Sequence, residues 1–186
     1  MKELSTHQPS LAKQHSKAQR WIAGCGIALA LGTVAAVLAV RYNPDLLRPL
    51  IKSGVPLEAA SNWPVIGYAI QQAETPLMSV QELKQLVDSK TKDYLLLDVR
   101  TPDEYKVSHI PGATLVPLID IENKTGIDKV KSSLQGRRLL VYCTSGKRSA
   151  RALVLLQQAG IKGTKIEGGI KSWTEEIDTS LPRNNW

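Results

Sequence analysis

Residues 138–149 of the chain read RLLVYCTSGKRS. After its first residue, the segment Arg138 to Tyr142 is a short apolar run, as expected for a strand that is buried on both faces. The segment Ser149 to Ala159 is rich in Ala, Leu and Val and is followed by Gly160, a pattern typical of a helix and its end. Cys143 therefore stands in a short loop between a predicted strand and a predicted helix.

The same alternation of strand and helix extends in both directions from this stretch. Strands are predicted at 94–99, 114–118, 138–142 and 164–166, and helices at 80–87, from 102 onward, at 127–134, 149–159 and 170–177. Ser79–Glu82 and Thr101–Glu104 have the spacing of capping boxes, which mark helix starts. We therefore expect an α/β fold with a mostly parallel central sheet, in which ligands bind at the carboxyl ends of the strands.

The loop after Cys143 combines features that stabilise a negative charge. The start of the following helix offers free backbone N–H groups and partial positive charge, which favours a thiolate. Gly146 permits the curvature of an anion-binding nest. Lys147, Arg148 and Arg151 add positive charge that attracts anions. These features favour a reactive cysteine, although position alone leaves a buried core cysteine as an alternative.

Four stretches of the chain, in order, resemble the signature motifs of the rhodanese (thiosulfate sulfurtransferase) family in its single-domain form. They are Asp98-Val99-Arg100 with Glu104-Tyr105, His109-Ile110-Pro111-Gly112-Ala113, Cys143-Thr144-Ser145-Gly146-Lys147-Arg148-Ser149, and Gly168-Gly169-Ile170 with Trp173. The third matches the active loop Cys-x-x-Gly-x-Arg-Ser/Thr. The resemblance implies a rhodanese-like three-layer fold over residues 77–182, with helices on both faces of the sheet and a short tail at 183–186.

The resemblance also implies a mechanism, in which Cys143 takes a sulfane sulfur from thiosulfate or a persulfide donor and passes it to a thiol or cyanide. The implied substrate-binding residues are Thr144, Ser145, Gly146, Lys147, Arg148 and Ser149. The backbone amides of residues 144–148 would stabilise the persulfide. Arg148 would anchor the anionic end of the donor with help from Lys147, and Ser149 would cap the following helix or also reach the sulfur.

Other residues of these motifs are expected to support the loop. Asp98 would orient Arg100 by a charge-assisted hydrogen bond, with direct substrate contact as the alternative. His109 is interpreted as structural, although a role as a base for Cys143 is conceivable, and Trp173 as a core residue. No residues have metal-ligand spacing, and we expect no cofactor.

The length of the loop separates two kinds of chemistry. Related phosphatases and arsenate reductases of this fold use a Cys-x5-Arg loop around a larger oxyanion, whereas four residues separate Cys143 from Arg148 here. The shorter loop favours sulfur transfer.

Composition limits the partners of the chain. The 186 residues carry a formal net charge of +7, but only 5% of them are aromatic. Basic and aromatic residues are not interleaved as in proteins that bind single-stranded nucleic acid. We therefore expect no nucleic acid among the partners. The family resemblance implies an anionic sulfur donor and a thiol or cyanide acceptor, and a membrane protein is a conceivable further partner.

Residues 21–40 form an uncharged apolar run between Arg20 and Arg41. A helix of this length would span about 30 Å, the thickness of the hydrocarbon core of a bilayer. We expect a single-pass transmembrane helix, preceded by a polar tail at 1–20 and followed by a Pro-rich linker at 41–76. A cleaved signal peptide is the alternative. The flanking basic residues do not decide the side of the membrane on which the domain lies.

Two other functions remain open from the sequence. The domain could dock onto or scaffold a membrane complex, or Cys143 could sense oxidants. The second cysteine, Cys25, lies inside the predicted membrane helix. A disulfide between the two cysteines is therefore not expected.

Overall fold

The computed structural model describes residues 36–41, 43–54 and 64–183. The predicted tail at 1–20, most of the predicted membrane helix and Cys25 lie outside these residues. Residues 36–41, at the end of the predicted membrane helix, are helical. Over the part of the chain that is described, no helix is both long and apolar enough to cross a membrane.

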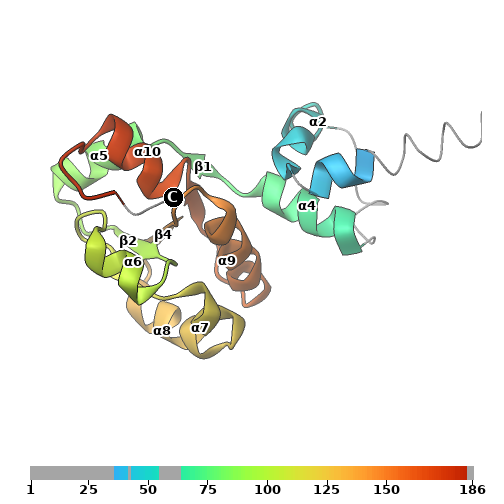
Figure 1. Ribbon diagram of the computed structural model, residues 1–186. Helices are drawn as coiled ribbons and strands as arrows, with labels where there is room; N and C mark the ends of the chain where they lie inside the picture. Colours follow the sequence, from blue (N-terminus) through green and yellow to red (C-terminus); the bar gives the residue numbers. More distant parts are fainter. Residues whose placement is uncertain (1–35, 42, 55–63, 184–186) are drawn as a thin grey trace, which may run out of the picture.

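Within the described residues, a five-stranded sheet forms the centre of the α/β domain (Figure 1). Its strands are β1 (Leu77–Met78), β2 (Tyr94–Asp98), β3 (Thr114–Leu115), β4 (Arg138–Tyr142) and β5 (Thr164–Ile166). Their spatial order is β1-β5-β4-β2-β3, and every neighbouring pair is parallel. The predicted parallel sheet is thus confirmed.

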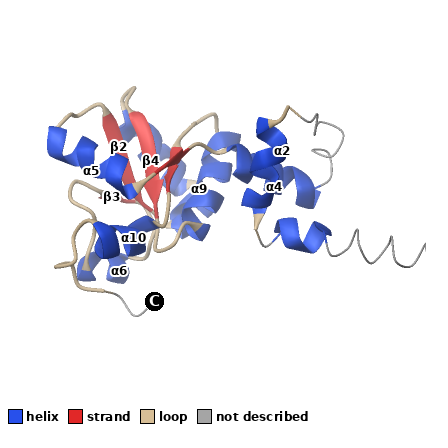
Figure 2. Cartoon of the chain, turned by 90° about the horizontal axis from the view of Figure 1, so that it is seen from above, coloured by secondary structure: helices blue, strands red, loops and turns tan. Residues whose placement is uncertain are grey.

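Helices cover both faces of this sheet (Figure 2). They are α5 (Val80–Ser89), α6 (Pro102–Val107), α7 (Leu118–Glu122), α8 (Thr125–Leu134), α9 (Lys147–Gln158) and α10 (Gly169–Glu176). Alternate strand residues face opposite ways. Leu97 and Val141 pack with residues of α7, α8 and α9, whereas Leu96 and Leu140 pack with residues of α5 and α10. This confirms the predicted three layers.

The strand predicted at 114–118 is shorter than expected. It ends at Leu115, and α7, which the sequence pattern did not predict, begins at Leu118. Pro117, which lacks an N–H group, separates the two elements. Val116 N still donates to Asp98 O (2.9 Å) and Leu118 N to Val99 O (3.1 Å). Hydrogen bonds to the end of β2 and to the residue after it therefore continue through the turn that replaces the end of the predicted strand.

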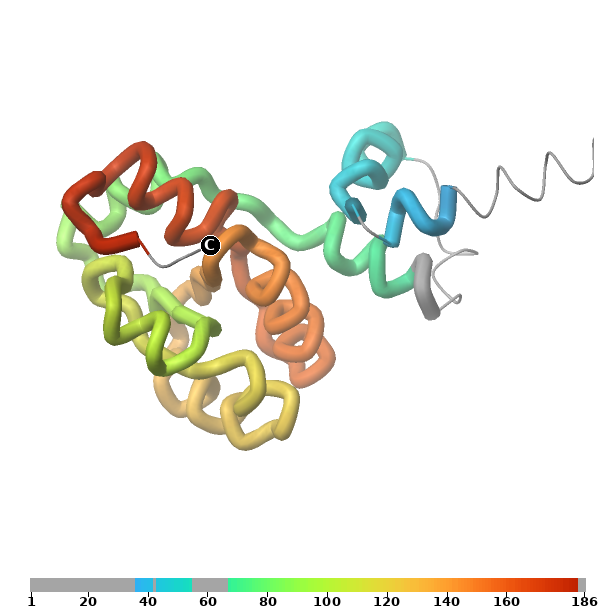
Figure 3. Tube along the Cα trace, viewed as in Figure 1, coloured from blue at the N-terminus to red at the C-terminus, as the bar shows by residue number. Residues whose placement is uncertain are grey.

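The segment 41–76, predicted as a linker, contains η1 (Pro44–Leu47), α2 (Arg48–Lys52) and α4 (Pro64–Glu74). Figure 3 shows these helices grouped beside the α/β domain, and α4 contacts α9. Leu47 packs against Ala69, Ile70 and Ala73 of α4. The guanidinium of Arg48 binds Asp45 (2.7 Å) and donates to Thr75 O (3.1 Å). Apolar packing and this arginine thus connect η1 and α2 to α4.

An ion pair between Asp98 and Arg100 lies at the carboxyl end of β2, and both side chains are fully buried. Arg100 Nε lies 3.0 Å from each Asp98 oxygen, Arg100 Nη2 lies 2.6 Å from Oδ2, and Nη2 also donates to Ser108 O (2.7 Å). Burial would lower the pKa of Arg100, but the hydrogen bonds to Asp98 and the negative charges of its surroundings together outweigh burial and raise that pKa. The prediction that Asp98 orients Arg100 is confirmed.

Asp98→Asn should lower the free energy of unfolding by about 3–5 kcal/mol, because it leaves the buried guanidinium of Arg100 without its counter-charge. Asp93→Asn is the matched control. Asp93 also pairs with an arginine, Arg138, but more than half of each of these side chains is exposed, so its loss should change stability little. Denaturant titration of the full-length variants measures both effects. Equal losses would show that burial of the Asp98 pair is unimportant.

Candidate functional site

Cys143 directly follows β4 at the carboxyl edge of the sheet and is almost completely buried. Its Sγ accepts a hydrogen bond from the backbone N–H of Gly146 at 3.1 Å. The loop therefore folds back so that the backbone of Gly146 contacts the side chain of Cys143. A sulfur held against a backbone donor in this way is stabilised when it carries negative charge.

Helix α9 begins at Lys147, two residues earlier than predicted, with Gly146 as its N-cap. Gly146 has a φ of 104°, a conformation that residues with a Cβ rarely adopt. The N–H groups of Lys147, Arg148 and Ser149 have no partners inside the helix, because they belong to its first turn. The positive end of α9 thus lies next to the sulfur of Cys143.

The prediction that Ser149 caps this helix is wrong, because the helix starts upstream of it. Ser149 occupies the third helical position, is fully buried, and donates its hydroxyl to Gly146 O at 3.0 Å. This bond reinforces the turn that Gly146 makes.

The start of α10 holds the other side of the loop. Ile170 N donates to Cys143 O (2.9 Å), and Lys171 N donates to Thr144 O (3.1 Å). In a trans peptide the C=O and the following N–H point in opposite directions. The N–H groups of residues 144 and 145 therefore point away from α10.

Gly169 makes this close approach possible. A Cβ at this position would lie 2.2 Å from Cys143 O, and its φ of 60° is in the left-handed region. The neighbouring Gly168 also has a positive φ, of 68°. The Gly-Gly pair of the fourth motif therefore serves to bring α10 against the backbone of the cysteine loop.

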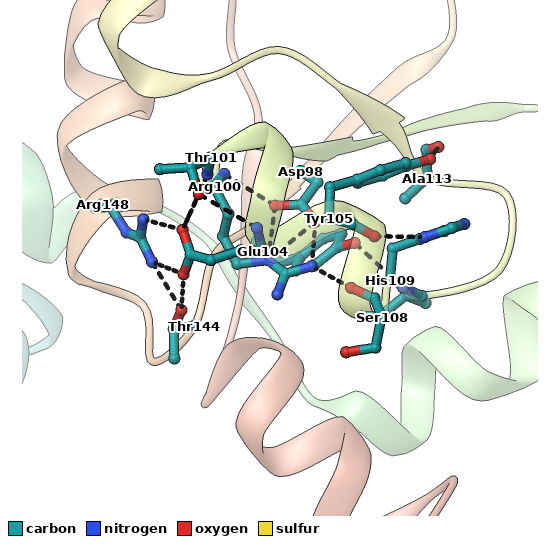
Figure 4. A network of polar contacts seen from close by, with 12 residues as sticks. Asp98, Arg100, Thr101, Glu104, Tyr105, Ser108, His109, Ala113, Thr144 and Arg148 are labelled. Carbon is teal, nitrogen blue, oxygen red and sulfur yellow. Dashed lines mark hydrogen bonds and ion pairs between the residues drawn. The ribbon is translucent and has the colours of Figure 1, made fainter. Parts of the chain in front are cut away.

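Arg148 forms a bidentate ion pair with Glu104 of α6 (Figure 4). Arg148 Nη1 donates to Glu104 Oε2 (2.7 Å) and Nη2 to Oε1 (2.6 Å). The hydroxyl of Thr144 accepts from Arg148 Nη2 (2.7 Å) and donates to Glu104 Oε1 (3.1 Å). We call these three residues the Glu104 clamp. The guanidinium that was predicted to anchor the donor is thus already bound to a carboxylate.

Both charges of the clamp are stabilised. The bonds from Arg148 lower the pKa of Glu104 to about 2, against the opposing effect of burial, with Thr101 contributing further. The bonds to Glu104 in turn raise the pKa of Arg148, where burial again opposes the shift and the nearby Cys143 adds to it. At neutral pH the pair is therefore a carboxylate and a guanidinium.

Glu104 was predicted to cap α6 but was not predicted to be a site residue. It does cap α6, since Oε2 accepts from Thr101 N (2.9 Å). The sequence contains one indirect signal for its second role. The carboxyl ends of neighbouring parallel strands meet at one edge, so the helix after β2 must approach the loop after β4. Which side chains then touch depends on the strand register, which the sequence does not state.

The remaining predicted residues occupy different places. The side chains of Ser145 and Lys147 are exposed. His109 stacks on Tyr105 with ring centres 4.0 Å apart, and its Nδ1 lies 3.0 Å from Tyr105 O, in keeping with the structural interpretation. Trp173 is buried in the core, as predicted. Among the described residues, no group of three or more His, Cys, Asp or Glu side chains is placed to hold a metal ion.

Comparison with known proteins agrees with this geometry. Residues 79–176 match the family model of the rhodanese-like domain. An uncharacterized 16.5 kDa protein in the psaL 5′ region of Synechococcus elongatus is 44% identical over 115 residues, which are 60% of this chain and 77% of that protein. The probable adenylyltransferase/sulfurtransferase MoeZ of Mycobacterium tuberculosis is 34% identical over 114 residues. These are 61% of this chain but 28% of MoeZ, so the chain spans about a quarter of that relative.

Two solved structures from Saccharomyces cerevisiae share the fold. An uncharacterized protein aligns with 59% of this chain and 99% of its own at a TM-score of 0.50 and 25% identity. Ygr203w, described as a homologue of single-domain rhodanese and of the Cdc25 phosphatase catalytic domain, aligns with 61% of this chain and 87% of its own. Its TM-score is 0.51 and its identity 16%, so this likeness concerns the fold alone.

The matched residues contain the whole parallel sheet except β1, together with the cysteine loop and the Glu104 clamp. On this evidence the chain belongs to the family of rhodanese-like domain proteins.

Proposed function

We propose that the chain is a sulfurtransferase in which Cys143 carries a sulfur atom as a persulfide. The observation that supports this most directly is the position of Sγ, which accepts a hydrogen bond from Gly146 N at the positive end of α9. A thiolate or a persulfide anion at this position is stabilised by backbone dipoles that need no rearrangement.

The proposed reaction has two displacements. The Cys143 thiolate attacks the outer sulfur of a donor, for example thiosulfate. The donor's S–S bond breaks, sulfite leaves with the electron pair, and the enzyme holds Cys143–S–S⁻. An acceptor thiolate or cyanide then attacks the terminal sulfur, the bond to Cys143 breaks, and the thiolate is regenerated. Neither step requires a proton, a metal or an external oxidant.

In this proposal the backbone N–H groups of the loop donate hydrogen bonds to the terminal sulfur of the persulfide. The N–H groups of Lys147, Arg148 and Ser149 have no partners within α9, and those of residues 144 and 145 point away from α10. Four residues separate Cys143 from Arg148. A loop of this length favours the binding of a single sulfur atom over the binding of a tetrahedral phosphate. The prediction that Lys147 and Arg148 attract the donor remains a proposal.

The direct test is intact-mass spectrometry of the full-length chain after incubation with thiosulfate. We expect one added sulfur atom, which cyanide removes. Cys143→Ser should show no addition while keeping its circular dichroism spectrum. A folded wild-type chain that takes up no sulfur from thiosulfate or from a persulfide would instead favour docking as the role of the domain.

Gly169→Ala should reduce the rate of persulfide formation by about 100-fold, because a Cβ 2.2 Å from Cys143 O displaces the loop from its reactive geometry. Gly136→Ala is the matched control. Gly136 also has a positive φ (76°), but a Cβ there would meet nothing within 4 Å. It should cost roughly 1–2 kcal/mol of stability through backbone strain and leave the rate unchanged. Similar rates in both variants would refute the proposed role of α10.

We also propose that residues 21–40 anchor the chain in a membrane, on the basis of their uncharged sequence between Arg20 and Arg41. The full-length chain should stay in the membrane fraction after alkaline carbonate extraction, and a variant lacking residues 1–40 should not. Protease digestion of sealed vesicles then determines the side on which the domain lies. A mature chain beginning at Val40 would identify a cleaved signal peptide instead.

A further inference from the structure

The Glu104 clamp bears on which donors the site accepts. We propose that Glu104 is a specificity-determining residue that competes with oxyanionic donors for Arg148, so that the chain prefers alkyl persulfides to thiosulfate. This inference rests on the proposed sulfur transfer and specifies its donor class. In thiosulfate the transferable sulfur is bonded to a sulfonate group, and the leaving group is sulfite. In an alkyl persulfide the transferable sulfur is bonded to an alkyl sulfur, and the leaving group is an alkyl thiolate.

The geometry of the clamp creates the competition. The paired N–H groups of a guanidinium bind two oxygens of one oxyanion in parallel. In Arg148 this edge already holds both oxygens of Glu104, at 2.7 and 2.6 Å. A sulfonate that approaches Arg148 at this edge must displace the carboxylate. A persulfide donor has no oxyanion that would bind this edge of Arg148, so it does not compete with Glu104.

Glu104 is also held in place from its own helix. Its Oε2 accepts from the backbone N–H of Thr101 (2.9 Å) and from the Thr101 hydroxyl (3.0 Å), which forms the capping box of α6. Its Oε1 accepts from Thr144 (3.1 Å). Moving the carboxylate aside would break bonds to α6 and to the cysteine loop together. The competitor is therefore a fixed part of the site.

The charges around the loop also favour alkyl persulfides over thiosulfate as donors. The sequence places three cations in or just after the loop, at Lys147, Arg148 and Arg151. In the structure Arg148 pairs with Glu104, and Arg151 pairs with Glu122 of α7. Two of the three positive charges thus have a carboxylate beside them, and the third, Lys147, is exposed to solvent. This arrangement attracts a dianion such as thiosulfate less than the sequence alone suggests.

Glu104→Gln tests the inference, because glutamine can serve in a capping box but carries no charge. We expect the KM for thiosulfate in persulfide formation to fall about tenfold, since the freed Arg148 can then bind the sulfonate. The rate with the persulfide of 2-mercaptoethanol, an uncharged thiol, should change less than about twofold. An unchanged or higher KM for thiosulfate, or equal effects on both donors, would overturn the proposal.

The chain offers a matched control in its other capping box. Glu82 caps α5 through Ser79 in the same way that Glu104 caps α6 through Thr101. The hydrogen bonds between Glu82 and Ser79 are exposed to solvent, and Glu82 is not part of the Glu104 clamp. Glu82→Gln should leave the kinetics with both donors unchanged. A shift in donor preference in this variant would mean that the preference follows net charge and not the clamp.

Two further variants keep the test decisive. In the double variant E104Q/R148Q the gain with thiosulfate should disappear, because the gain requires the freed guanidinium; a gain that persists would contradict competition for Arg148. If Glu104→Gln does not fold, Thr144→Val loosens the clamp from the other side and leaves the cap of α6 intact. It should also lower the KM for thiosulfate, and a rise would contradict the proposal.

Failure of the inference can be told apart from failure of the proposed function. If wild-type chain gains no sulfur from either donor, the sulfurtransferase proposal itself is wrong. If it gains sulfur from both donors and Glu104→Gln leaves their relative use unchanged, only the role of Glu104 is wrong.

Discussion

The parallel pairing of β2 with β4 is the interaction on which the rest of the structure depends. It runs in register from Tyr94 opposite Arg138 to Asp98 opposite Tyr142. Both strands are buried on two faces, so a slip by one residue would turn the apolar side chains of each layer toward the other. Because the strands are parallel, their carboxyl ends lie at the same edge of the sheet. The segment after Asp98 and the loop after Tyr142 therefore come together, and this meeting creates the site.

The starts of two helices arrange the backbone of the cysteine loop. Gly146 turns the chain so that α9 starts next to the sulfur, and the first amides of α10 bind the carbonyls of Cys143 and Thr144. The carbonyls of Cys143 and Thr144 are thus paired with α10, while the N–H group of Gly146 donates to the sulfur. Gly169 contributes only by lacking a side chain, which allows the two backbones to approach. Positive backbone dipoles, more than basic side chains, define the environment of Cys143.

Paired charged side chains join different segments of the chain around the cysteine loop. Asp98 and Arg100 are buried together and connect the end of β2 to the carbonyl of Ser108. Glu104 and Arg148 connect α6 to α9 across the site. A carboxylate bound to Arg148 is at first sight unexpected in a site that is proposed to bind anions. It is physically consistent with a sulfur carrier whose donor brings no oxyanion, because the pair leaves little net charge beside the sulfur.

By itself, the sequence determined what depends on neighbours along the chain. The apolar runs set β2 and β4, the capping boxes at Ser79 and Thr101 set the starts of α5 and α6, and Cys143 was placed between a strand and a helix. It did not determine α7, because the turn at Pro117 is stabilised by hydrogen bonds from its neighbours to Asp98 and Val99. It also missed the true start of α9 and the role of Ser149, which follow from the left-handed conformation of Gly146 and its bonds to Cys143 and Ser149. Only the tertiary structure decided that Glu104 meets Arg148. Forty-three residues separate them along the chain, and the register of two buried strands brings their opposite charges together.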